Sequence, residues 1–170
     1  MKALGLAGWS GSGKTTLLVA LLPLFRAQGL SVSTIKHAHH GFDLDRPGKD
    51  SFRHRAAGAH EVLVASAARW ALLHENAGEE MDFAALLARL SPVDLVLVEG
   101  FKRAPYPKIE VFRPALGKPP LWPEAPEIIA VASDAALPDC DRPVLPLDAP
   151  AEIAGWVARR LHLAAPAQSA

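Results

Sequence analysis

Cysteine and long hydrophobic runs are almost absent from this sequence. Cys140 is the only cysteine among 170 residues, so no disulfide can form within the chain and we expect a reducing compartment. No segment approaches the ~20 consecutive apolar residues of a membrane-spanning helix, and the first glycine-rich segment begins so early that we expect no signal peptide. Net charge is also lacking, since 18 basic side chains balance 18 acidic ones. We therefore expect a cytoplasmic protein that binds neither membranes nor nucleic acid.

Hydrophobic residues, in contrast, are plentiful enough for one sizeable core. They make up 50% of the sequence, and the length suits one domain. Strand-like and helix-like stretches alternate, which indicates a three-layer α/β domain with a mostly parallel sheet. We expect this single domain to span residues 1–163 and residues 164–170 to form a flexible tail.

The most informative stretch is the glycine-rich loop, residues 8–15, which reads GWSGSGKT. It matches the phosphate-binding pattern G-x-x-x-x-G-K-[ST] at every fixed position. The apolar run 3–7 before it is typical of a buried parallel strand, and the Leu- and Ala-rich run 16–28 after it is typical of a helix. In this context backbone N–H groups and the helix dipole face a bound phosphate. We therefore predict a nucleotide-binding domain of the P-loop NTPase type.

Individual residues of this loop have expected roles. Gly8, Gly11 and Gly13 allow positive φ angles and a close approach of the backbone to an anion. Lys14 is expected to reach the β- and γ-phosphates of a nucleotide and to act in catalysis, and the Thr15 hydroxyl is expected to bind Mg²⁺.

Two acidic residues come at the ends of apolar, strand-like runs. Glu99 ends the run 94–99, where an acid normally helps to hold Mg²⁺, so we predict a catalytic and metal-binding role for it. A strand-terminal acid without a ligand is the alternative. Asp134 follows the run 127–132, and we predict that its carboxylate reads the base of a bound nucleotide; a carboxylate can accept from N1–H and N2–H₂ of guanine, a pair that adenine does not present. The alternative is that it caps a turn, as Asp often does after a strand.

The segment 36–60 is unusually rich in histidine and charge, with five of the seven histidines and five basic residues. It begins at the carboxyl end of a predicted strand, the edge where open α/β sheets bind ligands. We therefore predict that Lys36 and His37 contact phosphate or a second anionic substrate. Asp50, at a predicted helix start, is expected to complete the Mg²⁺ shell. Two alternatives remain open: a solvated charged loop, and zinc binding by His37, His39 and His40.

The remaining expected elements follow from periodicity and from breakers. Two strand-like runs, 60–66 and 69–75, are joined by a short link and predict a β-hairpin. The five prolines between residues 114 and 126 predict an exposed, extended connection. Further strands are expected over 30–37, 94–99, 108–113, 127–132 and 144–145, and further helices over 50–57, 82–90 and 151–163.

Three tryptophans have different expected positions. Trp9 lies inside the glycine-rich loop, so we expect it to stack on a base or to pack on a partner. Trp70 and Trp156 are expected in the core.

Four stretches together resemble the molybdopterin-guanine dinucleotide biosynthesis adapter family (MobB). The likeness covers roughly residues 3–134, most of the chain. The glycine-rich loop alone is unspecific, but the combination of Lys-His, Pro-Gly-Lys-Asp-Ser, Arg-Trp-Ala-Leu and Glu-Gly-Phe-Lys is much more specific. The matching residues are 8–16, 35–37 with 42–45 and 47–51, 64–66 with 69–72, and 97–102.

The resemblance implies a GTP-binding, homodimeric accessory protein of molybdenum cofactor maturation with weak GTPase activity. Its implied partners are the molybdopterin guanylyltransferase, which attaches GMP to molybdopterin, and molybdopterin or its guanine dinucleotide. By the same likeness Asp50 and Glu99 serve Mg²⁺, and the loop 38–51 and Lys102 face the pterin or the partner enzyme. The implied ligands of GTP and Mg²⁺ are Gly11, Ser12, Gly13, Lys14, Thr15 and Thr16.

Two other classes of function use the same residues. One is a small-molecule kinase or ligase that acts on an anionic soluble acceptor, which would form product over many turnovers by itself. The other is an adapter whose nucleotide is mainly structural, which would keep its partner when Lys14 is replaced.

Overall fold

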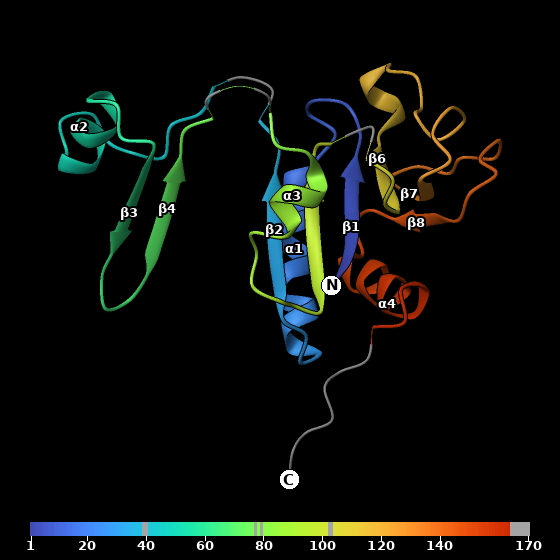
Figure 1. The fold of residues 1–170 in the computed structure, drawn as a ribbon. Coiled ribbons are helices and arrows are strands. Elements are labelled where there is room, and N and C mark those ends of the chain that lie inside the picture. The colour runs from blue at the N-terminus through green and yellow to red at the C-terminus, as the bar shows by residue number, and fades with distance from the viewer. Residues whose placement is uncertain (39–40, 77, 79, 102–103, 164–170) are drawn as a thin grey trace, which may run out of the picture. The chain divides into compact units, whose positions relative to one another are not determined.

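The computed structural model describes residues 1–38, 41–76, 78, 80–101 and 104–163. The chain divides into two compact units, which we call the sheet unit (Met1–His37 with Ala88–Ala170) and the hairpin unit (Ala38–Leu87). Their elements are labelled in Figure 1. Each unit is described by itself.

The sheet unit is built on a six-stranded sheet in the order β2-β5-β1-β6-β7-β8, and each neighbouring pair among the described strands is parallel (Figure 1). β1 lies between β5 and β6 and is hydrogen-bonded on both sides, as its apolar sequence predicts. Because all strands run in one direction, their carboxyl ends meet at one edge. The strands are β1 (Lys2–Ala7), β2 (Val32–Lys36), β5 (Leu95–Glu99), β6 (Lys108–Phe112), β7 (Ile128–Ser133) and β8 (Val144–Pro146).

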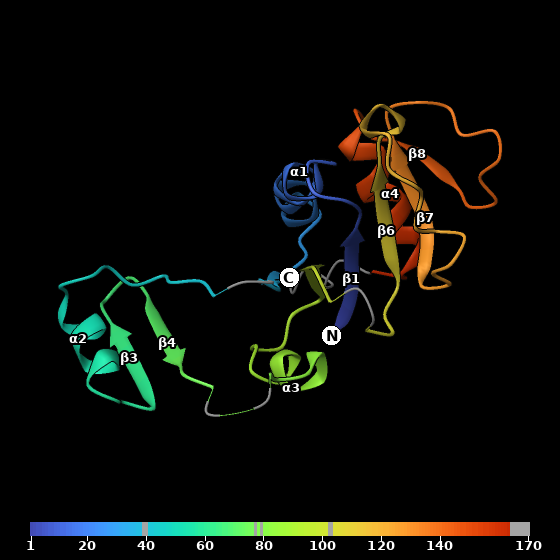
Figure 2. The ribbon, with the colours of Figure 1, turned by 90° about the horizontal axis from the view of Figure 1, so that it is seen from above.

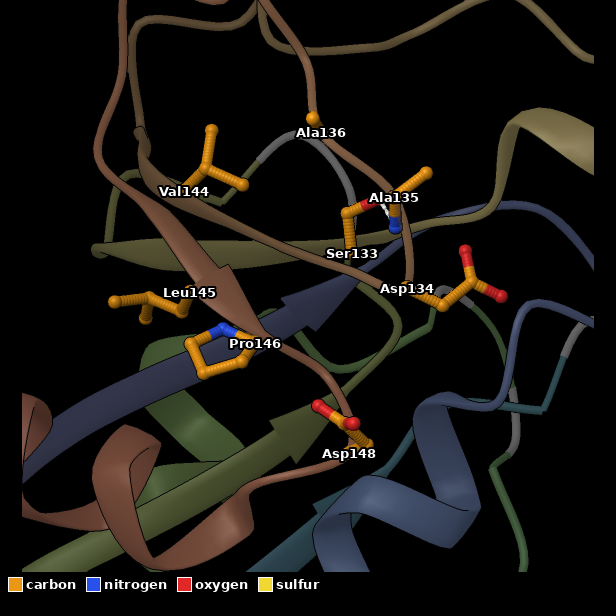
Figure 3. Close-up of a pocket in the computed structure, with 8 residues that line it drawn as sticks. All are labelled: Ser133, Asp134, Ala135, Ala136, Val144, Leu145, Pro146 and Asp148. Atoms are coloured by element: carbon orange, nitrogen blue, oxygen red, sulfur yellow. Dashed lines mark hydrogen bonds between the residues drawn. The ribbon is translucent and has the colours of Figure 1, made fainter.

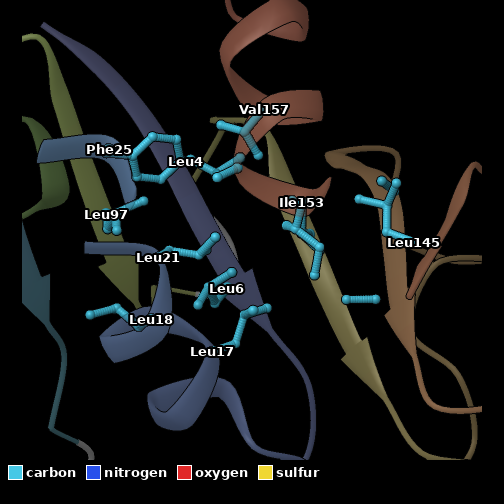
Figure 4. Packing of buried hydrophobic residues seen from close by; sticks show 14 of the residues in the cluster. Leu4, Leu6, Leu17, Leu18, Leu21, Phe25, Leu97, Leu145, Ile153 and Val157 are labelled. Carbon is cyan, nitrogen blue, oxygen red and sulfur yellow. The ribbon is translucent and has the colours of Figure 1, made fainter. Parts of the chain in front are cut away.

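Helices α1 (Lys14–Ala27) and α4 (Pro150–Arg160) cover one face of this sheet (Figure 2). In α1 the buried residues Leu17, Leu21 and Phe25 recur every fourth position, so they form one apolar stripe. Ile153 and Val157 of α4 continue the same core and are fully buried. Figure 4 shows these side chains meeting the strand residues in a single cluster.

The opposite face is covered in part by the connection 113–126, which includes the 3₁₀ turn η1 (Pro114–Leu116). The buried carboxylate of Glu110 in β6 accepts hydrogen bonds from the N–H groups of Leu121 (3.0 Å) and Trp122 (2.9 Å). Trp122 is buried and packs edge-on against Phe112, with ring centroids 5.2 Å apart. The prediction of an exposed connection is therefore wrong at Trp122, because Glu110 supplies a buried acceptor that proline content does not reveal.

The hairpin unit contains α2 (Asp50–Ala56), the strands β3 (Glu61–Ala65) and β4 (Trp70–His74), and α3 (Phe83–Leu87). β3 and β4 are antiparallel with Ala65 opposite Trp70, which confirms the predicted hairpin. Trp70 is 69% exposed, so its expected place in the core is wrong. A two-stranded ribbon has two faces, and Val62 is the buried residue among those described in β3 and β4. Trp156, in contrast, packs against the main core as expected.

The fold class predicted from the sequence is confirmed: a mostly parallel sheet with helices, plus a β-hairpin. The last predicted residues of the helix 82–90 are not helical, since α3 ends at Leu87. Within the described ranges, no helix has both the length and the apolar character needed to cross a bilayer.

Candidate functional site

The glycine-rich loop joins β1 to α1 at the carboxyl edge of the sheet. Gly8, Gly11 and Gly13 have φ angles of 135°, 81° and 101°, a region that L side chains rarely adopt. A Cβ atom on Gly8 would lie 2.5 Å from the carbonyl oxygen of Val111, so glycine is also required there by space. No side chain among the described residues caps α1 at Gly13. The first turn of α1 therefore offers its N–H groups to an anion.

Lys14 and Ser12 place polar groups inside this loop. The Lys14 ammonium donates hydrogen bonds to the carbonyls of Gly8 (3.0 Å) and Trp9 (2.8 Å). Ser12 is almost fully buried, and its hydroxyl has no hydrogen-bond partner among the residues described. A buried hydroxyl without a partner is unfavourable, so this atom fits a site completed by a bound oxyanion.

Thr15 and Glu99 bring a hydroxyl and a carboxylate together at the same edge. Thr15 Oγ1 lies 3.0 Å from each carboxylate oxygen of Glu99. Lys36 is the register partner of Glu99 on the neighbouring strand β2. Oxygen ligands of this kind suit Mg²⁺, which keeps several waters and binds through few protein groups. In the described part of the chain no group of three or more His, Cys, Asp and Glu residues is placed to hold a metal ion.

Arg113 is a functional candidate that the sequence did not single out. It follows β6, and its Nε donates a hydrogen bond to the backbone carbonyl of Ser12 (3.0 Å). Its Nη1 lies 2.5 Å from Oδ2 of Asp134, the residue after β7. The sequence clue to Arg113 was its position directly after a strand, because Glu99 and Asp134 also stand at the ends of strands at this edge of the sheet.

Beside this ion pair lies a cavity of 340 Å³ at the ends of β7 and β8 (Figure 3). It presents two carboxylates, those of Asp134 and Asp148. The other lining residues are Ser133, Ala135, Ala136, Val144, Leu145 and Pro146.

The loop after β5 is fixed against the end of β2. The N–H of His37 donates to the carbonyl of Glu99 (2.8 Å), and the rings of His37 and Phe101 lie 4.5 Å apart. Gly100 has a φ of 107°, and a Cβ there would collide with the Cβ of His37. Burial raises the pKa of Tyr106 to about 12, so its phenol stays protonated and donates to the carbonyl of Gly100 (3.0 Å).

In the hairpin unit, three acids surround one cation of the charged segment. Arg55 lies 2.9 Å from Asp43, 3.8 Å from Asp45 and 3.4 Å from Glu75. The pKa of Asp43 is lowered, chiefly by the backbone hydrogen bond from Asp45 and also by Arg55. Part of the segment's positive charge is therefore neutralised within the unit.

The structure thus gathers most of the predicted site residues at one sheet edge. These are Gly11, Ser12, Gly13, Lys14, Thr15, Thr16, Lys36, His37, Glu99 and Asp134. Asp50 begins α2 of the hairpin unit. Lys102, His39 and His40 lie outside the described residues, so the predictions made for them, zinc binding included, stay predictions.

The parallel sheet, with its strand–glycine loop–helix unit, defines a fold of the P-loop NTPase type. The family model for molybdopterin guanine dinucleotide synthesis protein B matches residues 3–134, and the chain belongs to this family. The molybdopterin-guanine dinucleotide biosynthesis adapter protein of Escherichia coli is 48% identical over 138 residues, 79% of each chain. The protein of the same name from Haemophilus influenzae is 42% identical over 161 residues, 94% of this chain and 89% of the relative.

Solved structures agree with this assignment. The crystal structure of Bacillus subtilis MobB has a TM-score of 0.74 and 26% identity, covering 94% of this chain and 98% of that one. A crystal structure of molybdopterin-guanine biosynthesis protein B also has a TM-score of 0.74, with 29% identity and coverage of 94% and 99%.

Proposed function

We propose that this protein binds GTP with Mg²⁺ and serves as an accessory protein to the guanylyltransferase that converts molybdopterin to its guanine dinucleotide. The names of its relatives support the pathway. The observation that carries the nucleotide is the pairing of the Thr15 hydroxyl with Glu99, beside a glycine-rich loop whose buried Ser12 hydroxyl has no partner among the described residues. We place the protein in the cytoplasm.

In the proposed complex the glycine-rich loop holds the phosphates and Lys14 exchanges its two carbonyl contacts for phosphate oxygens. Thr15 and Glu99 hold Mg²⁺, which supplies charge neutralisation between the phosphates. Asp50 is proposed to support the same ion. Gly11, Ser12, Gly13 and Thr16 complete the phosphate site.

We place the guanine base in the cavity at the ends of β7 and β8. Its carboxylates suit guanine, which presents N1–H and N2–H₂ donors on one edge, a pair that adenine does not present. Oδ2 of Asp134 is bound by Arg113, and the other oxygen of this carboxylate remains for the base.

The second ligand is proposed to be molybdopterin or its guanine dinucleotide. Lys36 and His37, at the end of β2, are proposed to contact its phosphate, together with Lys102 and the loop 38–51. Lys36 is exposed beside Glu99, which supports a role toward an anion near the metal.

Self-association is the third part of the proposal. Leu63, Trp70 and Leu72 lie on one face of the hairpin, because Leu63 pairs with Leu72 and Ala65 pairs with Trp70. They are 61%, 69% and 41% exposed. An isolated two-stranded hairpin is marginally stable, so we propose that a second copy of the chain covers this apolar face.

The test is calorimetric titration of the protein with GTP and ATP, with Mg²⁺ and with EDTA. We expect binding of GTP that is stronger than that of ATP and depends on Mg²⁺. Absence of binding to either nucleotide would overturn the proposal. Addition of purified molybdopterin and the guanylyltransferase then separates the alternatives: an accessory protein increases dinucleotide formation by the enzyme, whereas a kinase or ligase forms product over many turnovers alone.

A further inference from the structure

Arg113 contacts the glycine-rich loop through a backbone carbonyl. Its Nε donates to the carbonyl oxygen of Ser12 at 3.0 Å, while Nη1 pairs with Asp134. The two charged side chains are each 38% exposed. This pair therefore links the end of β6, the end of β7 and the loop between β1 and α1.

The orientation of one peptide bond follows from this contact. The chain has no cis peptide among the described residues, so the Ser12 carbonyl and the Gly13 N–H point in opposite directions. A carbonyl held toward Arg113 turns the Gly13 N–H away from it. Gly13 has a φ of 101°. Because glycine has no Cβ, the peptide bond before it can rotate more freely than one that precedes another type of residue. A side chain that fixes this peptide therefore removes freedom that the loop would otherwise have.

Resting on the proposed GTP site, we propose that Arg113 is a positioning residue for phosphate. It holds the Ser12–Gly13 peptide so that the Gly13 N–H faces the bound phosphates, and Asp134 holds the guanidinium in place. The energetic reason is preorganisation, since donors that are already aligned need no reordering when the anion binds. Arg113 is therefore expected to change the affinity for the phosphate groups of the ligand and not the affinity for its base.

The test compares three ligands, GTP, ITP and inorganic pyrophosphate with Mg²⁺, by calorimetry. The matched control is Arg142, whose Nε also donates to a backbone carbonyl, that of Ile128 (3.1 Å), and whose Nη1 pairs with Asp141 at 2.8 Å. Ile128 begins β7, so Arg142 makes the same kind of contact at the opposite edge of the sheet.

We expect Arg113→Ala to weaken all three ligands by the same factor, about ten- to hundredfold, with an unchanged ratio of GTP to ITP. Arg142→Ala should leave all three affinities unchanged. Asp134→Asn should weaken pyrophosphate less than Arg113→Ala does, and it should weaken GTP further than ITP, because the same carboxylate is proposed to accept from the guanine amine. Arg113→Lys, which keeps the charge and loses the planar fork, should fall between the parent and Arg113→Ala, and it serves if Arg113→Ala does not fold.

Two results would overturn the positioning role of Arg113 without contradicting the proposed GTP site of the parent protein. One is pyrophosphate affinity that Arg113→Ala and Arg113→Lys leave unchanged. The other is a loss in the Arg113 variants that is confined to GTP relative to ITP, which would give Arg113 a role at the base. If the parent protein binds none of the three ligands, the proposed function itself is wrong and the positioning role ends with it.

Discussion

The hydroxyl of Thr15 lies at the same distance, 3.0 Å, from both carboxylate oxygens of Glu99. A threonine from the start of α1 and an acid from the end of β5 thus converge where a nucleotide-bound cation is proposed. Removal of the hydroxyl by Thr15→Val should abolish the Mg²⁺-dependent part of GTP affinity. Calorimetry with Mg²⁺ and with EDTA measures this difference. Thr34→Val, on the exposed side of β2, is the control, and a Mg²⁺ dependence that survives in Thr15→Val would contradict the metal assignment.

Lys14 is the second test of the site. Lys14→Ala should weaken GTP binding about ten- to hundredfold, because one charge-assisted contact to phosphate is lost. In this structure the same ammonium bridges the carbonyls of Gly8 and Trp9, so the melting temperature should be measured alongside. Lys2→Ala, at the opposite edge of the sheet, is the matched control. Equal GTP affinity in Lys14→Ala and the parent protein would refute the nucleotide site.

Hydrolysis by the isolated protein should be slow, on the order of turnovers per minute or less. Arg113 lies beside the loop and is held by the Ser12 carbonyl and by Asp134, so we expect no arginine finger from it. A phosphate-release assay with GTP and Mg²⁺ measures the rate. Several turnovers per second without a partner would show that another group stabilises the transition state.

Glu110 should make stability depend on pH. Burial raises the pKa of Glu110, against the backbone hydrogen bonds from Leu121 and Trp122, which lower it. The folded state therefore binds the proton of the Glu110 carboxyl group more tightly than the unfolded chain does. The stabilisation that comes from this proton is complete below the ordinary glutamate pKa. That contribution is lost as pH rises through the raised pKa of the folded state.

The measurement is the free energy of unfolding in urea, from about pH 4 upward. Glu110→Gln cannot ionise, so its stability should vary less over this range than that of the parent protein. Glu124→Gln, on the exposed part of the connection, should follow the parent. A Glu110→Gln profile parallel to the parent's would show that other groups cause the pH dependence.

The apolar hairpin face should control self-association. Trp70→Ser should weaken dimer formation about thirtyfold or more, since a central tryptophan often contributes at least ~2 kcal/mol to an interface. Sedimentation over a concentration series gives the dissociation constant. Val64→Ser is the control, because Val64 is also exposed but lies on the other face of the hairpin. A monomeric parent, or a Trp70→Ser variant that dimerises like it, would rule out this face.

Sequence reasoning succeeded where local pattern and tertiary role coincide. The apolar runs of β1 and β5 predicted central parallel strands, because both faces of such strands are buried. It failed at Trp70, since an aromatic residue in a strand does not reveal which face has a covering layer. Arg113 and Glu110 were missed for a related reason. Their partners, Ser12 and Trp122, are brought to them by the fold of the whole sheet unit.

Hydrogen bonds at both ends fix β2 against β5. The N–H of Leu95 donates to the carbonyl of Ser31 at the amino end, and the N–H of His37 donates to the carbonyl of Glu99 at the carboxyl end. The hairpin unit, residues 38–87, is inserted between these two strands, and its described strands, β3 and β4, form a separate two-stranded sheet. The register beneath Thr15 and Glu99 is therefore set by pairing within the sheet unit, between two strands that are separated by residues 37–94 in the sequence.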